Sequence, residues 1–265
     1  MSVHLFGGVW APSCANFALR KTAEDNGQMY DSEVADTVRK NFYVDDCLKS
    51  VQSEQGAVKL AGDLRKMLAS GGFNLSKWTS NSREVLKSVP LSERAKGVKK
   101  LDFSKDHLPV ERALGVGWNT ESDQLVFKIS VKEKPPTRRG LLSMVSSLYD
   151  PLGLASPVCL QAKCILQELC RQKLGWDEAI PEDMSVRWEE WLERLPKLEQ
   201  FSINRCFTPP EMGKVSRREL HHFSDASETG YGAVSYLRSI DVDGKIHCAL
   251  VQAKSRLTPI KSECL

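Results

Sequence analysis

The hydrophobic period changes twice along this 265-residue chain, and this change constrains the fold more than any other feature. Before Pro135-Pro136 the chain combines one helix-like segment with short runs that resemble strands. Between Thr137 and Pro196, apolar residues recur at three- and four-residue intervals, as in amphipathic helices. From Glu219 onward the chain has strand-like segments separated by turn residues, the pattern of consecutive hairpins. The sequence therefore predicts an α+β fold.

The length allows two domains, or one domain and part of another, because domains usually contain about 100 to 150 residues. Hydrophobic residues make up 41% of the chain and charged residues 27%, a balance typical of a folded protein with a sizeable core. The two changes in period divide the chain into three parts, which are a mixed part before Pro135-Pro136, a helical part up to Pro196 and a strand-rich part after it.

Four amphipathic helices are predicted from apolar faces with i, i+3, i+4 spacing. Their faces are Val58, Ala61, Leu64, Met67 and Leu68; Leu141, Leu142, Val145 and Leu148; Cys159, Ala162, Leu166 and Leu169; and Met184, Trp188, Trp191, Leu192 and Leu195. Gly71-Gly72 ends the first helix, Thr137 caps the second, and Ser156-Pro157 supplies the N-cap and first-turn proline of the third.

Short antiparallel strands are predicted on either side of the helical part. GFNLSKW, RALGVGW and LVFKISV form the first group. ELHHFSDAS, GYGAVSYLR and IHCALVQAK form the second, with a turn at residues 241–244.

Charge and targeting signals exclude few classes of function. The net charge of +3, from 37 basic and 34 acidic residues, is too small to indicate nucleic-acid binding by itself. The N-terminus lacks the pattern of a signal peptide, and no uninterrupted apolar run is long enough to span a membrane, so an intracellular protein is expected.

The eight cysteines include no CxxC pair, which predicts reduced, buried thiols. A zinc site drawn from Cys206, His221, His222, His247 and Cys248 would lack the ligand spacing of structural zinc modules.

The segment NFYVDDCL places Asp45 and Asp46 inside an apolar run, at what the pattern suggests is the turn of a strand hairpin. Two-metal phosphoryl transfer requires carboxylates held at one point, because each Mg²⁺ must be neutralised while it bridges the reacting oxygens. The alternative is a hairpin turn that is acidic by chance, since a YxDD tetrapeptide alone is a weak signal.

Six ordered segments make the signal more specific. They are VHLFGGVWAPSCANFALRKTAEDN, NFYVDDCLKSV, GGFNLSKWTSN, ERALGVGWNTESDQLVF, TRRGLLSMVSSLYDPLGLASPV and ELHHFSDASETGYGAVSYLR. Together they resemble the Pol polyprotein of Bel/Pao LTR retrotransposons over essentially the whole chain. The resemblance implies the C-terminal part of a reverse-transcriptase palm in residues 1–134, a thumb in 135–196, a connection in 197–217, and the first strands of an RNase H-like domain in 218–265.

The resemblance also implies roles in an RNA-directed DNA polymerase. Asp45 and Asp46 match the catalytic, metal-binding YxDD box, which begins at Tyr43, and Asp45 is favoured as the direct metal ligand. Pro12 and Ser13 would lie near the substrate. Lys77 would lie near the nucleotide phosphates, although a solvated lysine explains it equally well.

The remaining binding residues each have a simpler explanation. Gly115 belongs to ALGVGW, which resembles the primer-grip hairpin but could be an ordinary core strand. The basic residues Lys132, Lys134, Arg138 and Arg139 would contact the template–primer backbone by charge, or they form a solvated basic linker.

In the last segment, SDAS resembles the RNase H motif that supplies the first catalytic, metal-binding aspartate, here Asp225. Gly230 and Gly232 fit the tight return into the next strand. The alternative is a hairpin with a surface aspartate. The intact enzyme would use Mg²⁺ or Mn²⁺, and its partners would be an RNA template, a DNA primer, the RNA–DNA hybrid, dNTPs and other parts of Pol, in a cytoplasmic particle or the nucleus.

The family pattern is incomplete in this chain. The upstream palm aspartate is not matched, Asp25, Asp31 and Asp36 are poor substitutes, and Glu263 comes too early for the RNase H glutamate. The chain is therefore expected to be inactive alone. Two alternatives are a non-catalytic nucleic-acid-binding remnant and a Pao-type aspartic peptidase. The peptidase is disfavoured because such enzymes need Asp-Thr/Ser-Gly, and Asp225-Ala226-Ser227 lacks the glycine directly after the hydroxyl residue.

Overall fold

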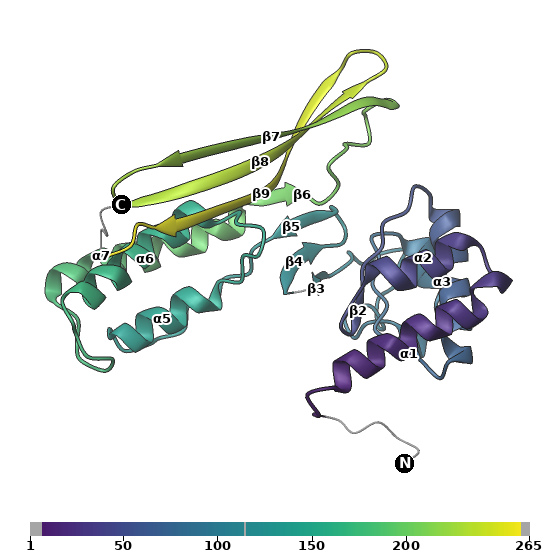
Figure 1. Cartoon of the computed structure of the whole chain (residues 1–265), viewed down its shortest axis with the longest axis horizontal. Coiled ribbons are helices and arrows are strands. Elements are labelled where there is room, and N and C mark those ends of the chain that lie inside the picture. Colours follow the sequence, from purple (N-terminus) through teal and green to yellow (C-terminus); the bar gives the residue numbers. More distant parts are fainter. Residues whose placement is uncertain (1–6, 114, 261–265) are drawn as a thin grey trace. The chain divides into compact units, whose positions relative to one another are not determined.

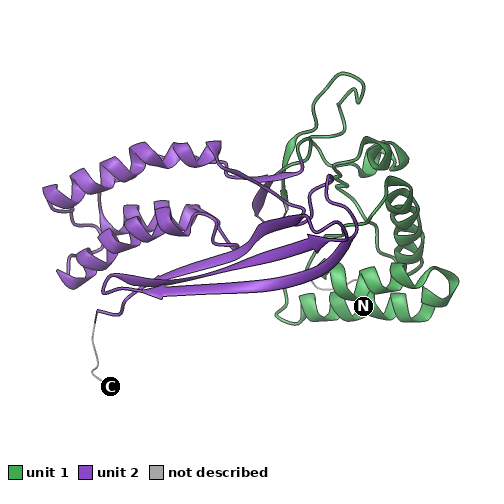
Figure 2. Ribbon diagram, turned by 90° about the horizontal axis from the view of Figure 1, so that it is seen from above, with its two compact units in different colours: residues 1–114, 119–122 green, residues 115–118, 123–265 purple. Residues whose placement is uncertain are grey.

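The computed structural model describes residues 7–113 and 115–260 and divides the chain into two compact units. Unit 1 contains residues 1–114 and 119–122, and unit 2 contains residues 115–118 and 123–265 (Figure 2). Helices and strands occur in both units, so the mixed α+β class is confirmed. Leu114 of ALGVGW, the beginning of the VHLFGG segment, Glu263 and Cys264 lie outside the described residues.

Unit 1 is mainly helical, with a hairpin between its second and third helices (Figure 1). Its helices are α1 (Ala11–Asn26), α2 (Ser32–Asn41), α3 (Glu54–Ser70) and α4 (Arg83–Ser88), with 3-10 turns at Gly27–Met29 and Leu91–Glu93. Its strands are β1 (Phe42–Tyr43), β2 (Asp46–Cys47) and β3 (Val110–Ala113).

The first core of unit 1 joins α1, α2 and α3. Its buried residues are Leu19, Ala23, Val34, Ala35, Val38, Leu60, Leu64, Met67 and Leu68. The Ser53 hydroxyl caps α3 by accepting a hydrogen bond from the Gly56 N–H, and Gly71 ends the helix. The predicted helix is confirmed, and its predicted face is buried except for the half-buried Val58.

A second core of unit 1 packs around α4 and the loop after it. Leu86, Ala95, Val98 and Leu108 are buried there. Helix α4 was not predicted, because its six residues are too few for a periodic signal. The strand predicted over GFNLSKW is wrong. Apart from an isolated bridge between Trp78 and Arg94, residues 72–78 form no strand.

The helical core of unit 2 contains α5 (Arg138–Ser147), α6 (Ser156–Arg171) and α7 (Glu182–Arg194), followed by a 3-10 segment at Leu195–Gln200. All three predicted helices are confirmed. Their shared core consists of Leu141, Met144, Val145, Ala162, Ile165, Leu169, Ile180, Met184, Trp188, Trp191 and Leu195. The face of α5 differs from the prediction, since Leu142 is exposed and Met144 is buried in its place.

The predicted N-cap of α5 is confirmed, whereas the predicted N-cap of α6 is wrong. The Thr137 hydroxyl accepts a hydrogen bond from the Gly140 N–H, as predicted. Ser156 is not the N-cap of α6 but its first helical residue. The N–H groups of Leu154 and Ala155 instead donate to the Asp150 carboxylate, each over 2.8 Å, and this pair of bonds fixes the turn that enters α6.

After β3 the chain forms the short strands β4 (Val116–Asn119) and β5 (Gln124–Val126) and, beyond the helices, β6 (Ser202–Asn204). Strand β5 pairs antiparallel with β6, with Leu125 opposite Ile203. The strand predicted over LVFKISV ends at Val126, so only its beginning is confirmed.

Three long antiparallel strands form the C-terminal sheet, in the order β7 (Val215–Ala226), β8 (Gly230–Asp241) and β9 (Ile246–Leu257) (Figure 1). All three predicted strands are confirmed, and each extends to twelve residues. Gly244 adopts a φ of 81° in the predicted turn between β8 and β9. Helix α6 packs beside β9, and in the turn before α6 the Leu152 carbonyl accepts a hydrogen bond from the Ala253 N–H over 2.8 Å.

The seven cysteines within the described residues are all free. The prediction of buried thiols is wrong for Cys14, Cys170, Cys206 and Cys248, which are exposed, whereas Cys159 is buried. No helix among the described residues has both the length and the apolar character needed to cross a membrane.

Candidate functional site

Three predicted site residues, Tyr43, Asp45 and Asp46, lie on a hairpin of two short strands, residues 42–47, which we name the acidic hairpin. Phe42 lies opposite Cys47 and Tyr43 opposite Asp46, so Val44 and Asp45 form the two-residue turn. The base of the hairpin is closed by the Leu48 N–H, which donates to the Asn41 carbonyl over 2.9 Å, and by the Asn41 side-chain amide, which donates to the Leu48 carbonyl over 2.8 Å.

The two faces of this hairpin have different environments. Phe42 packs against the first core of unit 1, and burial raises the pKa of the Cys47 thiol to about 11 because it disfavours the thiolate. Tyr43, Asp45 and Asp46 are exposed. The hairpin is thus anchored by its apolar side chains while both carboxylates face solvent.

Val44 has a φ of 54°, in the left-handed region that branched residues rarely adopt. Such a conformation costs about 1 to 3 kcal/mol and persists only where the surrounding structure enforces it. Gly or Asn would fit this position of a two-residue turn without strain. Formation of the hairpin therefore does not by itself explain a valine here.

The carboxylates of Asp45 and Asp46 are available to a cation. Within the described residues, neither forms an ion pair with a basic side chain. Carboxylate oxygens are the donors that Mg²⁺ and Mn²⁺ prefer, and Mg²⁺ is commonly held by one or two carboxylates together with substrate phosphates. Residues 7–113 and 115–260 gather no group of three or more His, Cys, Asp or Glu suited to a metal ion, so the hairpin offers a pair of ligands.

The other site residues predicted in unit 1 lie on separate elements. Pro12 and Ser13 are exposed in the first turn of α1. Lys77 is exposed in the loop before α4 and has a φ of 60°, so the chain turns sharply there. Among the described residues, no hydrogen bond or ion pair links these three to the acidic hairpin.

Gly115 lies in the turn between β3 and β4 and has a φ of 85°. This conformation favours glycine, and a Cβ atom here would also lie 2.6 Å from the ring of the exposed Tyr149, which would have to shift.

The basic residues around the start of α5 fall into two groups. Lys132 and Lys134 are exposed and have no ion-pair partner among the described residues. Arg138 and Arg139 are already engaged within unit 2 and flank the Trp176 ring, with guanidinium carbons 4.5 and 5.9 Å from its centroid.

Each of these arginines also forms polar contacts. Arg138 donates to the Leu174 carbonyl and lies 3.1 Å from the Cys170 sulfur. Arg139 binds both carboxylate oxygens of Asp177, over 2.7 and 3.0 Å, and this bond lowers the pKa of the Asp177 carboxyl. A phosphate would have to compete with these partners.

Asp225 is the penultimate residue of β7 and lies opposite Gly232 of β8. Its side chain is exposed and has no ion-pair partner among the described residues. The turn beyond it is tight, since the Ser227 N–H donates to the Gly230 carbonyl over 2.8 Å. A Cβ atom on Gly230 would lie 2.8 Å from the Arg256 carbonyl oxygen, so this glycine permits the close approach of β9.

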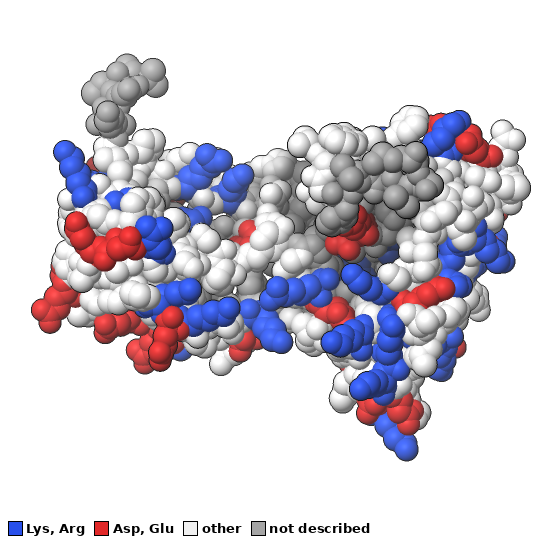
Figure 3. Space-filling model, turned by 90° about the horizontal axis from the view of Figure 1, so that it is seen from below, with Lys and Arg blue, Asp and Glu red and all other residues white. Residues whose placement is uncertain are grey.

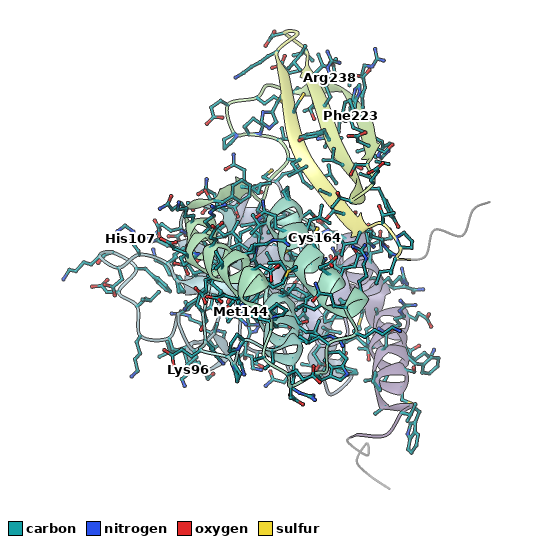
Figure 4. The ribbon with its side chains drawn as sticks, turned by 90° about the vertical axis from the view of Figure 1, so that its left-hand side faces the viewer. Lys96, His107, Met144, Cys164, Phe223 and Arg238 are labelled. Carbon is teal, nitrogen blue, oxygen red and sulfur yellow. The ribbon has the colours of Figure 1, made fainter. Side chains whose placement is uncertain are left out.

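Asp225 shares its side of the sheet with polar and aromatic neighbours, because side chains alternate along a strand. Phe223 and Tyr236 form an edge-to-face pair with centroids 6.2 Å apart. Glu219 accepts a hydrogen bond from Arg238 over 2.6 Å, which lowers the pKa of the Glu219 carboxyl. Figure 4 labels Phe223 and Arg238 on this sheet.

A cluster that the sequence did not indicate stabilises the turn between β4 and β5. Asp123 has a φ of 53° and accepts hydrogen bonds from Arg205, over 2.6 and 2.8 Å, and from the Trp118 indole over 2.9 Å. Arg205 is remote in sequence, so no local pattern could have identified the cluster. Its contacts are internal, which indicates a structural role.

A cavity of about 390 Å³ lies between α6 and β9. Its lining includes Lys163, Gln167, Cys170 and Arg256, and none of the predicted site residues. The cavity and the predicted catalytic carboxylates are therefore separate features.

Residues 137–265 match the family model of the Pao retrotransposon-like RNaseH-like domain. The matched part contains helices α5 to α7 and strands β6 to β9, and with them Asp225. This Pao-type match supports the predicted origin in a Bel/Pao retrotransposon Pol protein. It begins at Thr137 and so includes the segments predicted as thumb and connection. No curated protein matches the chain.

Proposed function

We propose that the chain is part of a retrotransposon Pol polyprotein that holds an RNA–DNA hybrid and donates catalytic carboxylates to two nucleic-acid reactions. In this proposal, residues 1–134 belong to the palm of an RNA-directed DNA polymerase, 135–196 to its thumb and 197–217 to the connection. The strands from residue 218 onward begin an RNase H domain. The Pao-type match of residues 137–265 supports the RNase H assignment.

The acidic hairpin carries the polymerase part of the proposal. Its two adjacent carboxylates are exposed on an anchored hairpin, and the turn between them and Tyr43 is strained at Val44. Backbone strain of this kind concentrates at functional sites. Asp45 and Asp46 would hold Mg²⁺ or Mn²⁺, with Asp45 as the direct ligand. The bound metal would neutralise the phosphoryl oxygens during nucleotidyl transfer.

Asp225 would be the first metal-binding carboxylate of the RNase H site. Its place at the end of a strand, beside a glycine-dependent turn, holds the carboxylate at the sheet margin and leaves it exposed. Additional ligands for both sites would come from other parts of Pol, so we expect neither reaction from this chain alone.

The remaining predicted residues would bind substrate. Pro12 and Ser13 would lie beside the incoming dNTP, Lys77 would face its phosphates, and Gly115 would allow the primer-grip turn. Lys132 and Lys134 are better placed than Arg138 and Arg139 to bind the template–primer backbone, because the two arginines have internal partners.

Binding of a fluorescein-labelled RNA–DNA hybrid to the full chain, measured by fluorescence anisotropy with and without Mn²⁺, tests this proposal. We expect a dissociation constant of about 10⁻⁶ to 10⁻⁴ M at physiological salt. Mn²⁺ should tighten binding through the acidic hairpin. The variant Asp45→Asn/Asp46→Asn should lose this response but bind at least as well without metal, because it removes two negative charges near the nucleic acid.

The matched control is Glu24→Gln/Asp63→Asn, which removes the same charge from α1 and α3 and should preserve the Mn²⁺ response. Failure of the native chain to bind the hybrid at low salt would refute the proposal. Hybrid binding that is indifferent to Mn²⁺ and to the Asp45/Asp46 variant would instead support a non-catalytic hybrid-binding remnant.

A further inference from the structure

A cluster of lysines projects from a turn in unit 1 that none of the proposed roles uses. We name Lys96, Lys99 and Lys100 the lysine turn. All three are exposed, and Figure 4 labels Lys96. The backbone here forms one helical turn, because the N–H groups of Val98 and Lys99 both donate to the Ala95 carbonyl, over 3.0 and 3.1 Å.

Helical geometry places these lysines on one side. Residues at i, i+3 and i+4 share a face of a helical turn, which is the spacing of Lys96, Lys99 and Lys100. Ala95 and Val98, with exposed fractions of 6% and 1%, point into the second core of unit 1. The buried side chains of Ala95 and Val98 therefore hold the turn against the core, while the three lysine side chains are exposed to solvent.

The lysine turn differs from most other basic groups of unit 1 in having no carboxylate partner. The neighbours of most of those groups are acidic: Lys21 pairs with Asp25, Lys40 with Asp36, Lys49 with Glu33, Lys59 with Asp31, Arg65 with Glu93, Arg83 with Glu121 and Lys87 with Glu84. Lys96, Lys99 and Lys100 form no ion pair with any described residue.

The acids near the lysine turn in sequence or in space have other contacts. The Glu111 carboxylate lies against Gly97, and its pKa is raised by burial. Asp102 accepts hydrogen bonds from the backbone and side chain of Ser104, and Asp106 accepts one from the Asp102 N–H. Basic and acidic side chains are mixed on the face that Figure 3 shows.

We propose that the lysine turn binds the phosphate backbone of a nucleic acid. This inference rests on the proposed function and adds a contact surface to it. Three clustered ammonium groups on an anchored turn suit a polyanion with regularly spaced charges, since each lysine that meets a phosphate releases counterions. Binding there would follow backbone charge and not base sequence, because a lysine ammonium that contacts phosphate reads no base edge.

The salt dependence of hybrid binding by the full chain tests the proposal. In the variant Lys96→Gln/Lys99→Gln/Lys100→Gln, the slope of log K against log salt should become shallower by about 2 to 3, close to one per phosphate contact. Affinity at low salt should fall at least about tenfold. The variant Lys96→Arg/Lys99→Arg/Lys100→Arg keeps the charge and should keep the native slope.

The matched control, Lys21→Gln/Lys40→Gln/Lys59→Gln, changes the net charge equally but removes lysines that already have carboxylate partners, and it should leave the slope nearly native. Far-UV circular dichroism establishes that each variant is folded. If the glutamine variant fails to fold, single substitutions of Lys96 and Lys100 should each make the slope shallower by about one.

The outcomes separate this inference from the proposed function. If the native chain binds no hybrid, the proposed function fails, and this inference fails with it. If the native chain binds and the glutamine variant keeps the native slope, the inference alone is overturned. A poly-glutamate peptide that binds the native chain as tightly as the hybrid does, and whose binding alone is lost in the glutamine variant, would assign the lysine turn to an acidic protein and also overturn it.

Discussion

At the scale of single residues, the backbone conformation of Val44 links folding to the proposed chemistry. Its φ of 54° is unfavourable for a branched side chain, yet it closes the turn that exposes Asp45 and Asp46. Glycine would remove the strain at the cost of greater freedom in the unfolded chain. The native valine thus lowers the stability of the fold but restricts the conformations that the turn can adopt.

We expect Val44→Gly to increase the free energy of unfolding by about 1 kcal/mol, because relief of the strain outweighs the added unfolded-state entropy. The same substitution should weaken the Mn²⁺ response of hybrid binding, since the carboxylates are held less firmly. Urea denaturation and the anisotropy assay measure the two effects.

Val110→Gly is the matched control for this substitution. Val110 is an exposed strand residue without a positive φ, so its replacement by glycine should lower stability by up to about 1 kcal/mol. If Val44→Gly lowers stability as Val110→Gly does, the left-handed conformation at residue 44 stores no strain.

The sequence predicted the position of the acidic pair better than it predicted the partners of the basic residues. Asp45 and Asp46 lie at a hairpin turn, as expected, because local patterning determines where the chain reverses. The engagement of Arg138 with Leu174 and Trp176 could not be foreseen, since it depends on how α5 packs against the segment after α6. Contacts of this kind follow from tertiary structure.

At the scale of elements, two glycines illustrate how position determines the effect of one substitution. Gly153 precedes α6 with a φ of 73°, and a Cβ atom there would lie 1.8 Å from the Ala253 carbonyl oxygen on β9. Gly62 lies within α3, where a Cβ atom would meet nothing within 4 Å.

We expect opposite effects on stability from alanine at these two positions. Gly153→Ala should lower the free energy of unfolding by at least about 2 kcal/mol, because it adds both a backbone penalty and a clash with a strand. Gly62→Ala should raise it by about 0.5 to 1 kcal/mol through higher helix propensity. Chemical denaturation of the full chain measures both, and a neutral result at Gly153 would contradict the tight junction between α6 and β9.

The elements that the sequence predicted well are those with a sustained period. Helices α3, α6 and α7 and strands β7 to β9 each span at least twelve residues, which is long enough for a repeating pattern to be recognised. Helix α4 and the region of GFNLSKW are short, and their main contacts are with residues outside them, Leu86 in the second core of unit 1 and Trp78 in its bridge to Arg94. Short elements therefore depend on information that no local window contains.

At the scale of the whole molecule, the two units have separate hydrophobic cores. Met67 and Leu68 belong to the core of α1, α2 and α3, whereas Leu141 and Leu169 belong to the core of α5, α6 and α7. None of the buried residues is shared between these clusters. Each core can thus be perturbed alone, which makes the independence of the units measurable.

We expect Leu169→Ala to destabilise unit 2 by about 2 to 5 kcal/mol, because it leaves a cavity at a side chain with 0% exposure. Native-state hydrogen exchange of the full chain, followed by mass spectrometry, should show faster exchange in α5, α6 and α7 and unchanged exchange in α3. Met67→Ala, at an equally buried position of unit 1, should give the reverse pattern. If either variant accelerates hydrogen exchange equally in both units, the chain unfolds as one cooperative body. Loss of hybrid binding in a variant of one unit would then not assign the binding to that unit.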